Sequence, residues 1–157
     1  MRAIFVTIFA AFMSLSFVSI ASADETQIEV TNAWARPVFM AGRTGAAYFM
    51  LKNNGAEDDR LLAVKTTLSE RAELHEHIHD QGVMKMRQVD HVDAPAGKMV
   101  MFAPGGYHVM IFDVKEKLSE GDSFPLILTF EKAGDVEVTA HVMKQAPMQG
   151  HDHSGHH

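Results

Sequence analysis

The 157-residue chain is mildly acidic and contains no cysteine. Its 20 acidic and 14 basic side chains give a net charge of −6 with histidines neutral, which disfavours nucleic acid and anionic lipid as partners. The lack of cysteine excludes disulfide bonds, thiol redox chemistry and thiolate metal sites such as blue-copper centres and sulfur-ligated zinc centres. A metal site in this sequence must therefore use other ligands.

The first 23 residues have the pattern of a secretory signal peptide. Arg2 is their one charged residue, an apolar run follows from Ala3, and Ala21-Ser22-Ala23 is a small-x-small cleavage site. A transmembrane anchor is the alternative, but three serines dilute the second half of the run. We expect residues 1–23 to be cleaved and the mature chain, beginning at Asp24, to be secreted.

The following sequence alternates short β-rich segments with turn signals, and it shows no long 3.6-residue period. Strands are expected at 28–32, 47–52, 60–66, 72–77, 84–89, 99–102, 107–112, 124–130 and 136–142. Turn signals such as Asn53-Asn54-Gly55 and Pro104-Gly105-Gly106 separate them. This pattern predicts an all-β domain over 24–143, built as an antiparallel β-sandwich or Greek-key barrel.

The last residues, 144–157, differ from the rest of the chain. They contain few bulky apolar side chains, so their burial could not offset the entropy of ordering them, and we expect a disordered tail. Four histidines fall within the last seven positions, a density that favours metal binding over simple solvation. Imidazole-rich sites suit Cu(II), and the candidate tail ligands are Met148, His151, His153, His156 and His157.

Two histidines and two methionines in the β domain form a candidate copper site. His75, Met86, His108 and Met110 have the spacing His-x10-Met-x21-His-x-Met. Thioether sulfur is soft and cannot be protonated, so it favours Cu(I), whereas imidazole accepts many metals. His108 and Met110 are two residues apart on one expected strand, so their side chains leave the same face. The spacing predicts a Cu(I) site.

Five segments make the sequence similar to the periplasmic copper chaperones called PCu(A)C. These segments are Asn-Ala-Trp-Ala-Arg-Pro at 32–37, Gly-Ala-Ala-Tyr-Phe at 45–49, Glu-Leu-His-Glu at 73–76, Gly-Val-Met-Lys-Met-Arg at 82–87 and Pro-Gly-Gly-Tyr-His-Val-Met at 104–110. The resemblance covers about Val30 to Val142, and it includes all four candidate ligands. It implies a cupredoxin-like fold, a Cu(I) site on those ligands and copper supply to a respiratory oxidase, with a Sco-type copper and thiol protein as a further partner.

The remaining histidines and methionines have structural interpretations. His77 and His79 alternate with His75 and could extend the site, but we expect them to be exposed at the end of a hairpin. Glu76 is a weak candidate for orienting a ligand imidazole. His91 and His141 are interpreted as structural. Four further methionines are interpreted as core fillers: Met50, Met84, Met99 and Met101.

Three classes of function are compatible with a copper site. A metallochaperone is favoured, because thioether and imidazole ligands hold Cu(I) exchangeably in an oxidising compartment. An enzyme is disfavoured, because no nucleophile or acid-base constellation is evident. A copper sequestration or resistance protein without a dedicated client is the alternative, and the sequence hardly separates it from the chaperone. We expect a monomer, with a metal-bridged dimer as the other possibility.

Overall fold

The computed structural model describes residues 27–147, and this part of the chain is built from β-strands without any helix. The strands are β1 (Ile28–Ala35), β2 (Gly45–Asn53), β3 (Asp59–Thr66), β4 (Arg71–Asp80), β5 (Val83–Gln88), β6 (Val92–Ala94), β7 (Met99–Phe102), β8 (His108–Phe112), β9 (Ser123–Phe130) and β10 (Gly134–Val142). Across 27–147 no helical segment could span a bilayer. The predicted signal peptide, residues 1–23, and the predicted metal-binding residues of the tail lie outside the described residues.

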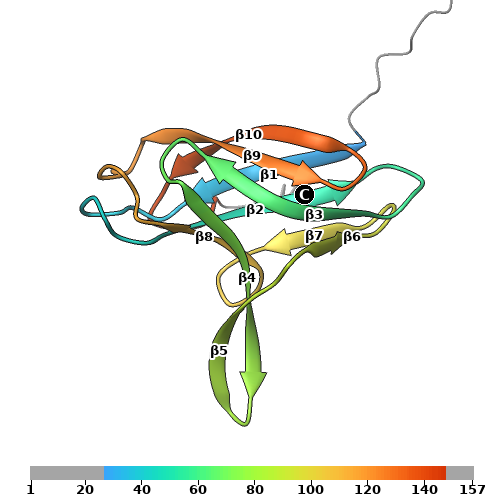
Figure 1. Cartoon of the computed structure of the whole chain (residues 1–157), viewed down its shortest axis with the longest axis horizontal. Helices are drawn as coiled ribbons and strands as arrows, with labels where there is room; N and C mark the ends of the chain where they lie inside the picture. Colours follow the sequence, from blue (N-terminus) through green and yellow to red (C-terminus); the bar gives the residue numbers. More distant parts are fainter. Residues whose placement is uncertain (1–26, 148–157) are drawn as a thin grey trace, which may run out of the picture.

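The strands form one continuous hydrogen-bonded sheet, which folds over on itself to enclose one core (Figure 1). The strand order is β5-β4-β8-β2-β1-β10-β9-β3-β6. β8 pairs with the first part of β2, and β7 pairs with the second part. All the pairs are antiparallel except β1 with β10, which is parallel. The predicted all-β sandwich is confirmed, and the parallel pair is the exception to its antiparallel pattern.

Alternation along the strands decides which face enters the core. On β2, Ala47, Phe49 and Leu51 are buried, and Val109 and Ile111 are buried on β8. Leu126 and Leu128 of β9 complete the opposite side of the core. Because side chains alternate between faces with a period of two, the even-numbered residues of β2 and β8 point to the outer face. The candidate ligands of β8 therefore lie on that outer face.

The four methionines interpreted as core fillers do not belong to the core. Met84, Met99 and Met101 are each about half exposed, at 48%, 54% and 53%, so the core interpretation is wrong for them. Met50 is half-buried and pairs in register with Met101 on the outer face. The sequence pattern could not separate the two faces here, because apolar residues occupy both sides of β7.

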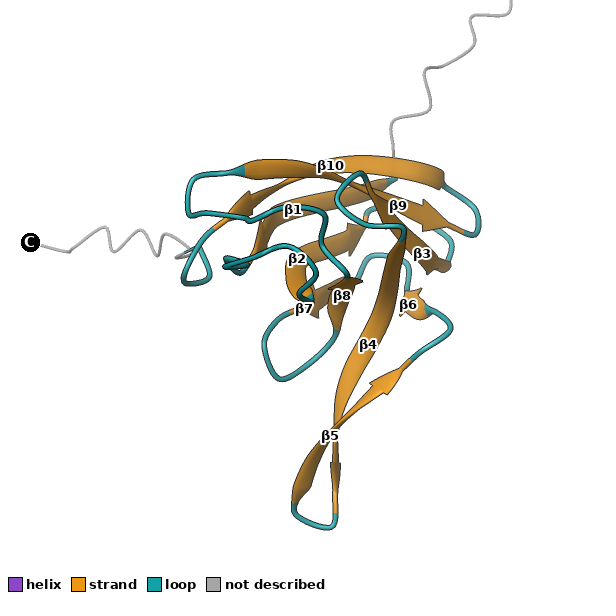
Figure 2. Ribbon diagram, turned by 60° about the vertical axis from the view of Figure 1, so that its left-hand side comes forward, coloured by secondary structure: helices purple, strands orange, loops and turns teal. Residues whose placement is uncertain are grey.

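The β4–β5 hairpin projects from the body of the molecule (Figure 2). Its strands are joined by Gln81 and Gly82, whose φ angles of 49° and 82° are both positive, as a two-residue type I′ turn requires. The base of β4 pairs with β8, whereas the outer part pairs only with β5 among the described strands. The hairpin thus places Met86, a candidate ligand, in an exposed position.

Candidate metal centre

Three neighbouring strands, β5, β4 and β8, bring the four candidate ligands to one face. His75 of β4 pairs in register with His108 of β8, and Met110 lies two residues further along β8. On the other side of β4, His75 pairs with Gln88, two residues from Met86 on β5. Diagonal neighbours of this kind are within reach of long side chains. His75 is therefore directly opposite one ligand and diagonal to the two methionines.

The His108 ring is buried and held in one orientation by the turn that precedes β8. Its Nδ1–H donates to the carbonyl oxygen of Gly106 over 3.0 Å, and only 3% of the residue is exposed. Since a carbonyl can only accept, the proton of the neutral ring must be on Nδ1. The Nε2 lone pair is left buried, with no hydrogen-bond partner in the described part of the chain.

His75 is oriented by a carboxylate on its own strand. Its Nε2–H donates to Glu73 Oε2 over 2.9 Å, which leaves the buried Nδ1 as the lone pair without a partner among residues 27–147. Arg71 in turn lies 3.7 Å from Glu73, and its guanidinium carbon is 3.9 Å from the centre of the Phe112 ring. A carboxylate that accepts a hydrogen bond from the ring nitrogen facing away from the metal is a common support for histidine ligands. It fixes the tautomer and makes the other nitrogen a better donor to the metal.

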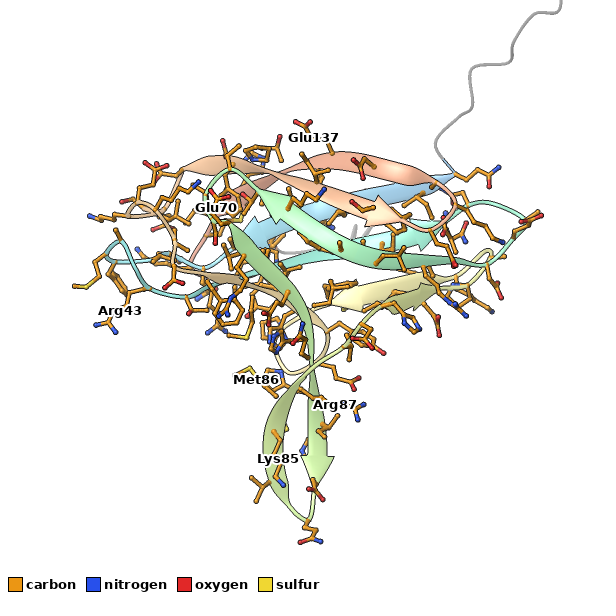
Figure 3. All side chains as sticks on the ribbon, in the orientation of Figure 1. Arg43, Glu70, Lys85, Met86, Arg87 and Glu137 are labelled. Carbon is orange, nitrogen blue, oxygen red and sulfur yellow. The ribbon has the colours of Figure 1, made fainter. Side chains whose placement is uncertain are left out.

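Glu76, the candidate for orienting an imidazole, does not have that role. It points to the opposite side of the hairpin, where its carboxylate binds the Arg87 guanidinium. Figure 3 shows Met86 and Arg87 on opposite sides of the hairpin, as alternation requires. The expectation for Glu76 is therefore wrong, and Glu73 is the residue that the sequence analysis missed. Its position two residues before His75, on the same face of a strand, was the available signal.

His77 also lies at the site, although we expected it to be exposed. It is half-buried, its Nδ1 is buried without a hydrogen-bond partner in residues 27–147, and its ring centre is 4.8 Å from that of His108. In register it faces Met86. His79 is exposed near the hairpin turn, as expected. His91 and His141 are outside the three strands that form the site.

Aromatic packing supports the inner side of the site. The Trp34 and Tyr48 rings stack with their centres 4.6 Å apart, and the Tyr48 and His108 ring centres are 6.4 Å apart. His75 continues this row, 5.9 Å from His108 and 6.2 Å from Phe112 between ring centres. These aromatic rings shield the imidazoles from solvent on the inner side, whereas Met86, on the outer side, is 56% exposed.

Burial also sets the charge state of His108. It lowers the pKa of His108, the neighbouring His77 and His75 act in the same direction, and the hydrogen bond to Gly106 opposes them. A neutral imidazole is the metal-binding form. The lowered pKa thus favours the neutral form of His108, which can offer a lone pair to a cation.

No three imidazole or carboxylate groups within 27–147 already surround a common metal position. The thioethers of Met86 and Met110 are the remaining donors on this face. Together with two oriented imidazoles they fit Cu(I), which accepts soft sulfur and nitrogen ligands. The assignment of the four ligands stays a prediction, which their placement on one face supports.

Comparisons with known proteins find a matching family model and a similar sequence. Residues 28–142 match the family model LpqE-like, described as "Putative lipoprotein LpqE-like". The protein RP573 of Rickettsia prowazekii (strain Madrid E) is 33% identical over 111 residues, which are 68% of this chain and 61% of that relative. The chain thus spans about three fifths of the length of this relative.

Two solved structures are also similar. The copper-bound PCuAC domain from PmoF2 has a TM-score of 0.62 at 27% identity, and the match covers 77% of this chain and 94% of that domain. The solution structure of CuI-DR1885 from Deinococcus radiodurans has a TM-score of 0.59 at 26% identity, covering 78% and 83%. These matches confirm the predicted cupredoxin-like architecture.

Proposed function

Because the chain belongs to the LpqE-like family and has the fold of the PCu(A)C copper-binding domains, we propose that it is a copper metallochaperone for a respiratory oxidase. In this proposal it binds one Cu(I) through His75, Met86, His108 and Met110, outside the cytoplasmic membrane. The copper is cargo, and the protein is a carrier rather than an enzyme. One of the two similar structures is copper-bound and the other is a Cu(I) form, which supports the choice of metal.

One observation carries the proposal: His75 and His108 each have a buried ring nitrogen without a hydrogen-bond partner among residues 27–147, and they lie on the face that also carries two thioethers. Each ring uses its other nitrogen to bind Glu73 or Gly106. Leaving buried nitrogen lone pairs unpaired costs about 1–3 kcal/mol each, so a ligand that accepts them is favoured. A soft cation binds the lone pairs of both imidazole and thioether. Water could donate a hydrogen bond to the imidazole nitrogens, but thioether sulfur is only a weak hydrogen-bond acceptor.

The same geometry suits release as well as binding. Thioethers bind Cu(I) more weakly than thiolates do, so transfer to a cysteine-containing acceptor is downhill. Met86 lies on the exposed hairpin, and His75 and His108 lie deeper at its base. An acceptor could therefore replace the outer sulfur first and the imidazoles later, so that no free ion is released.

The predicted compartment and partners follow from this chemistry. The family is described as a putative lipoprotein, which supports an exported protein, and we propose the periplasm. The proposed client is the copper-binding subunit of the oxidase. Because this chain supplies no thiol, the client cysteines must be reduced by another protein, for which a Sco-type protein is the candidate. The tail remains a proposed Cu(II) site.

A transfer experiment tests this function. Cu(I)-loaded full-length protein is mixed anaerobically with the soluble copper domain of the host oxidase, either reduced or with its cysteines oxidised. Copper should move to the reduced domain and hardly at all to the oxidised one. A bystander apo-protein with a comparable metal affinity is the control. Retention of copper here at equilibrium, with the reduced domain still empty, would support sequestration instead.

A further inference from the structure

The backbone holds His77 against His108 through a shared carbonyl group. Gly106 accepts a hydrogen bond from the backbone N–H of His77 over 3.3 Å and another from Nδ1–H of His108 over 3.0 Å. One carbonyl thus fixes the strand at His77 and the ring of His108. The two ring centres are consequently only 4.8 Å apart, which is closer than His75 is to His108.

Three neighbouring imidazoles therefore each present a buried nitrogen without a hydrogen-bond partner in the described structure. These atoms are Nδ1 of His75, Nδ1 of His77 and Nε2 of His108. For His75 and His108 the other nitrogen carries the proton, so the free atom is a lone pair. Within 27–147 these three imidazoles do not yet surround a common metal position, but all three lie on one face, and their unpartnered nitrogens favour a ligand that accepts lone pairs, which is a metal cation.

The ring separations are close to those of imidazoles that share one ion. A metal–nitrogen bond of about 2.0 Å puts two such ring centres about 4.4 Å apart at a right angle and about 5.1 Å apart at a tetrahedral angle. The His77–His108 separation of 4.8 Å falls within that range. The His75–His108 separation of 5.9 Å is larger, so these two rings must approach by about 0.8 Å for a tetrahedral angle and by about 1.5 Å for the right angle that Cu(II) prefers.

We propose that His75, His77 and His108 form a second donor set for Cu(II), overlapping the Cu(I) set. The inference rests on the proposed function, because His75 and His108 belong to both sets. Cu(II) prefers imidazole nitrogen and gains little from thioether, whereas Cu(I) uses Met86 and Met110. Since two ligands are shared, the core holds one copper ion in either oxidation state, and His77 determines whether it accepts the oxidised ion.

Cu(II) binding by the core changes the result expected when the tail histidines are removed. If the tail alone binds Cu(II), a chain without tail histidines should lose Cu(II) binding. If the core accepts Cu(II) as well, such a chain keeps one equivalent. The tail-silenced chain, defined as the full-length protein with His151, His153, His156 and His157 replaced by Asn, separates the two cases.

The test measures Cu(II) affinity by chelator competition and counts coordinated imidazoles by pulsed EPR in the tail-silenced chain. We expect one equivalent of Cu(II) with three imidazoles. Adding His77→Asn should lower the affinity at least about tenfold and reduce the count to two. His79→Asn is the matched control, because His79 is exposed on the same strand and face, and it should change neither value.

Cu(I) affinity, measured in the same variants, distinguishes this proposal from the proposed function. Because His77 lies outside the Cu(I) set, His77→Asn should weaken Cu(II) binding by a larger factor than Cu(I) binding, and retained Cu(I) binding shows that the variant is folded. Met110→Leu should weaken Cu(I) binding more than Cu(II) binding. The second donor set is wrong if the tail-silenced chain binds no Cu(II), or if His77→Asn binds it as tightly as the parent. If Met110→Leu instead bound Cu(I) as tightly as the parent, the four-ligand Cu(I) site would be wrong. The affinity for Zn(II), which also binds imidazole nitrogen, should fall in His77→Asn in the same way.

Discussion

At the scale of single residues, the site depends on groups that hold the ligands as well as on the ligands. Glu73 fixes the ring of His75 through a bond of 2.9 Å, and the backbone of Gly106 fixes His108. Both leave the metal-facing nitrogen as a lone pair. In the proposed site this arrangement would orient two ligands before copper binds, and it can be tested residue by residue.

Replacing Glu73 by Leu should lower Cu(I) affinity about 10–100-fold, because His75 loses the acceptor that fixes its tautomer. Glu73→Gln retains an acceptor oxygen and should lose less. Affinity is measured by competition with a Cu(I) chelator. The matched control is Glu76→Gln, whose side chain lies on the other side of the hairpin and should leave affinity unchanged. Equal effects at the two positions would contradict the role of Glu73.

The lowered pKa of His108 gives a pH prediction. In the folded apo-protein its ring should titrate below about 6.5, the ordinary value, so this ligand stays available for copper in mildly acidic solution. The unfolded chain takes up the proton more readily. The contribution of His108 to folding stability should therefore decline as pH falls from about 6.5 toward the folded pKa. NMR titration of the imidazole signals checks the shift, and a midpoint at or above about 6.5 would contradict it.

At the scale of structural elements, turns decide where the ligands point. The turn before β8 has Pro104 at its second position and Gly105, with φ of 87°, at its third, and the amide of Gly106 donates to the carbonyl of Ala103. This is the type II pattern, which needs a positive φ at that glycine. It places the Gly106 carbonyl under both His108 and His77.

Gly105→Ala should therefore weaken copper binding as well as stability. A side chain at this positive φ costs about 1–2 kcal/mol and shifts the carbonyl that holds His108. Gly97→Ala is the matched control, because Gly97 also has a positive φ, of 69°, and its turn is away from the site strands. Thermal unfolding should show similar losses for both variants, whereas Cu(I) affinity should fall only for Gly105→Ala.

Much of the β architecture was predictable, because the apolar and turn residues repeat at strand intervals. The segment 47–52 lies within β2, and 124–130 lies within β9. β6 was missed because its three residues are too few to show alternation. His77 and Glu73 were not assigned to the site, since their role depends on which strand lies beside β4. A single strand pattern does not contain that pairing.

At the scale of the whole molecule, the described sheet contains the proposed Cu(I) ligands, and the predicted tail site comes after it in the chain. Replacing the four tail histidines by Asn should therefore leave Cu(I) affinity within about threefold, because Cu(I) depends on the thioethers of the sheet. The total number of bound Cu(II) ions should fall. Copper titration under reducing and then oxidising conditions measures both numbers. A matching loss of Cu(I) would show that sheet and tail form one joint site.

X-ray absorption at the copper edge of the Cu(I)-loaded full-length protein tests the central assignment most directly. We predict a reduced copper ion with two sulfur and two nitrogen neighbours, from Met86, Met110, His75 and His108. Met110→Leu keeps a side chain of similar volume but removes one sulfur, so the protein should stay folded while the sulfur count falls to one and affinity drops at least about tenfold. A spectrum with nitrogen or oxygen neighbours alone, or one unchanged in Met110→Leu, would contradict the assignment.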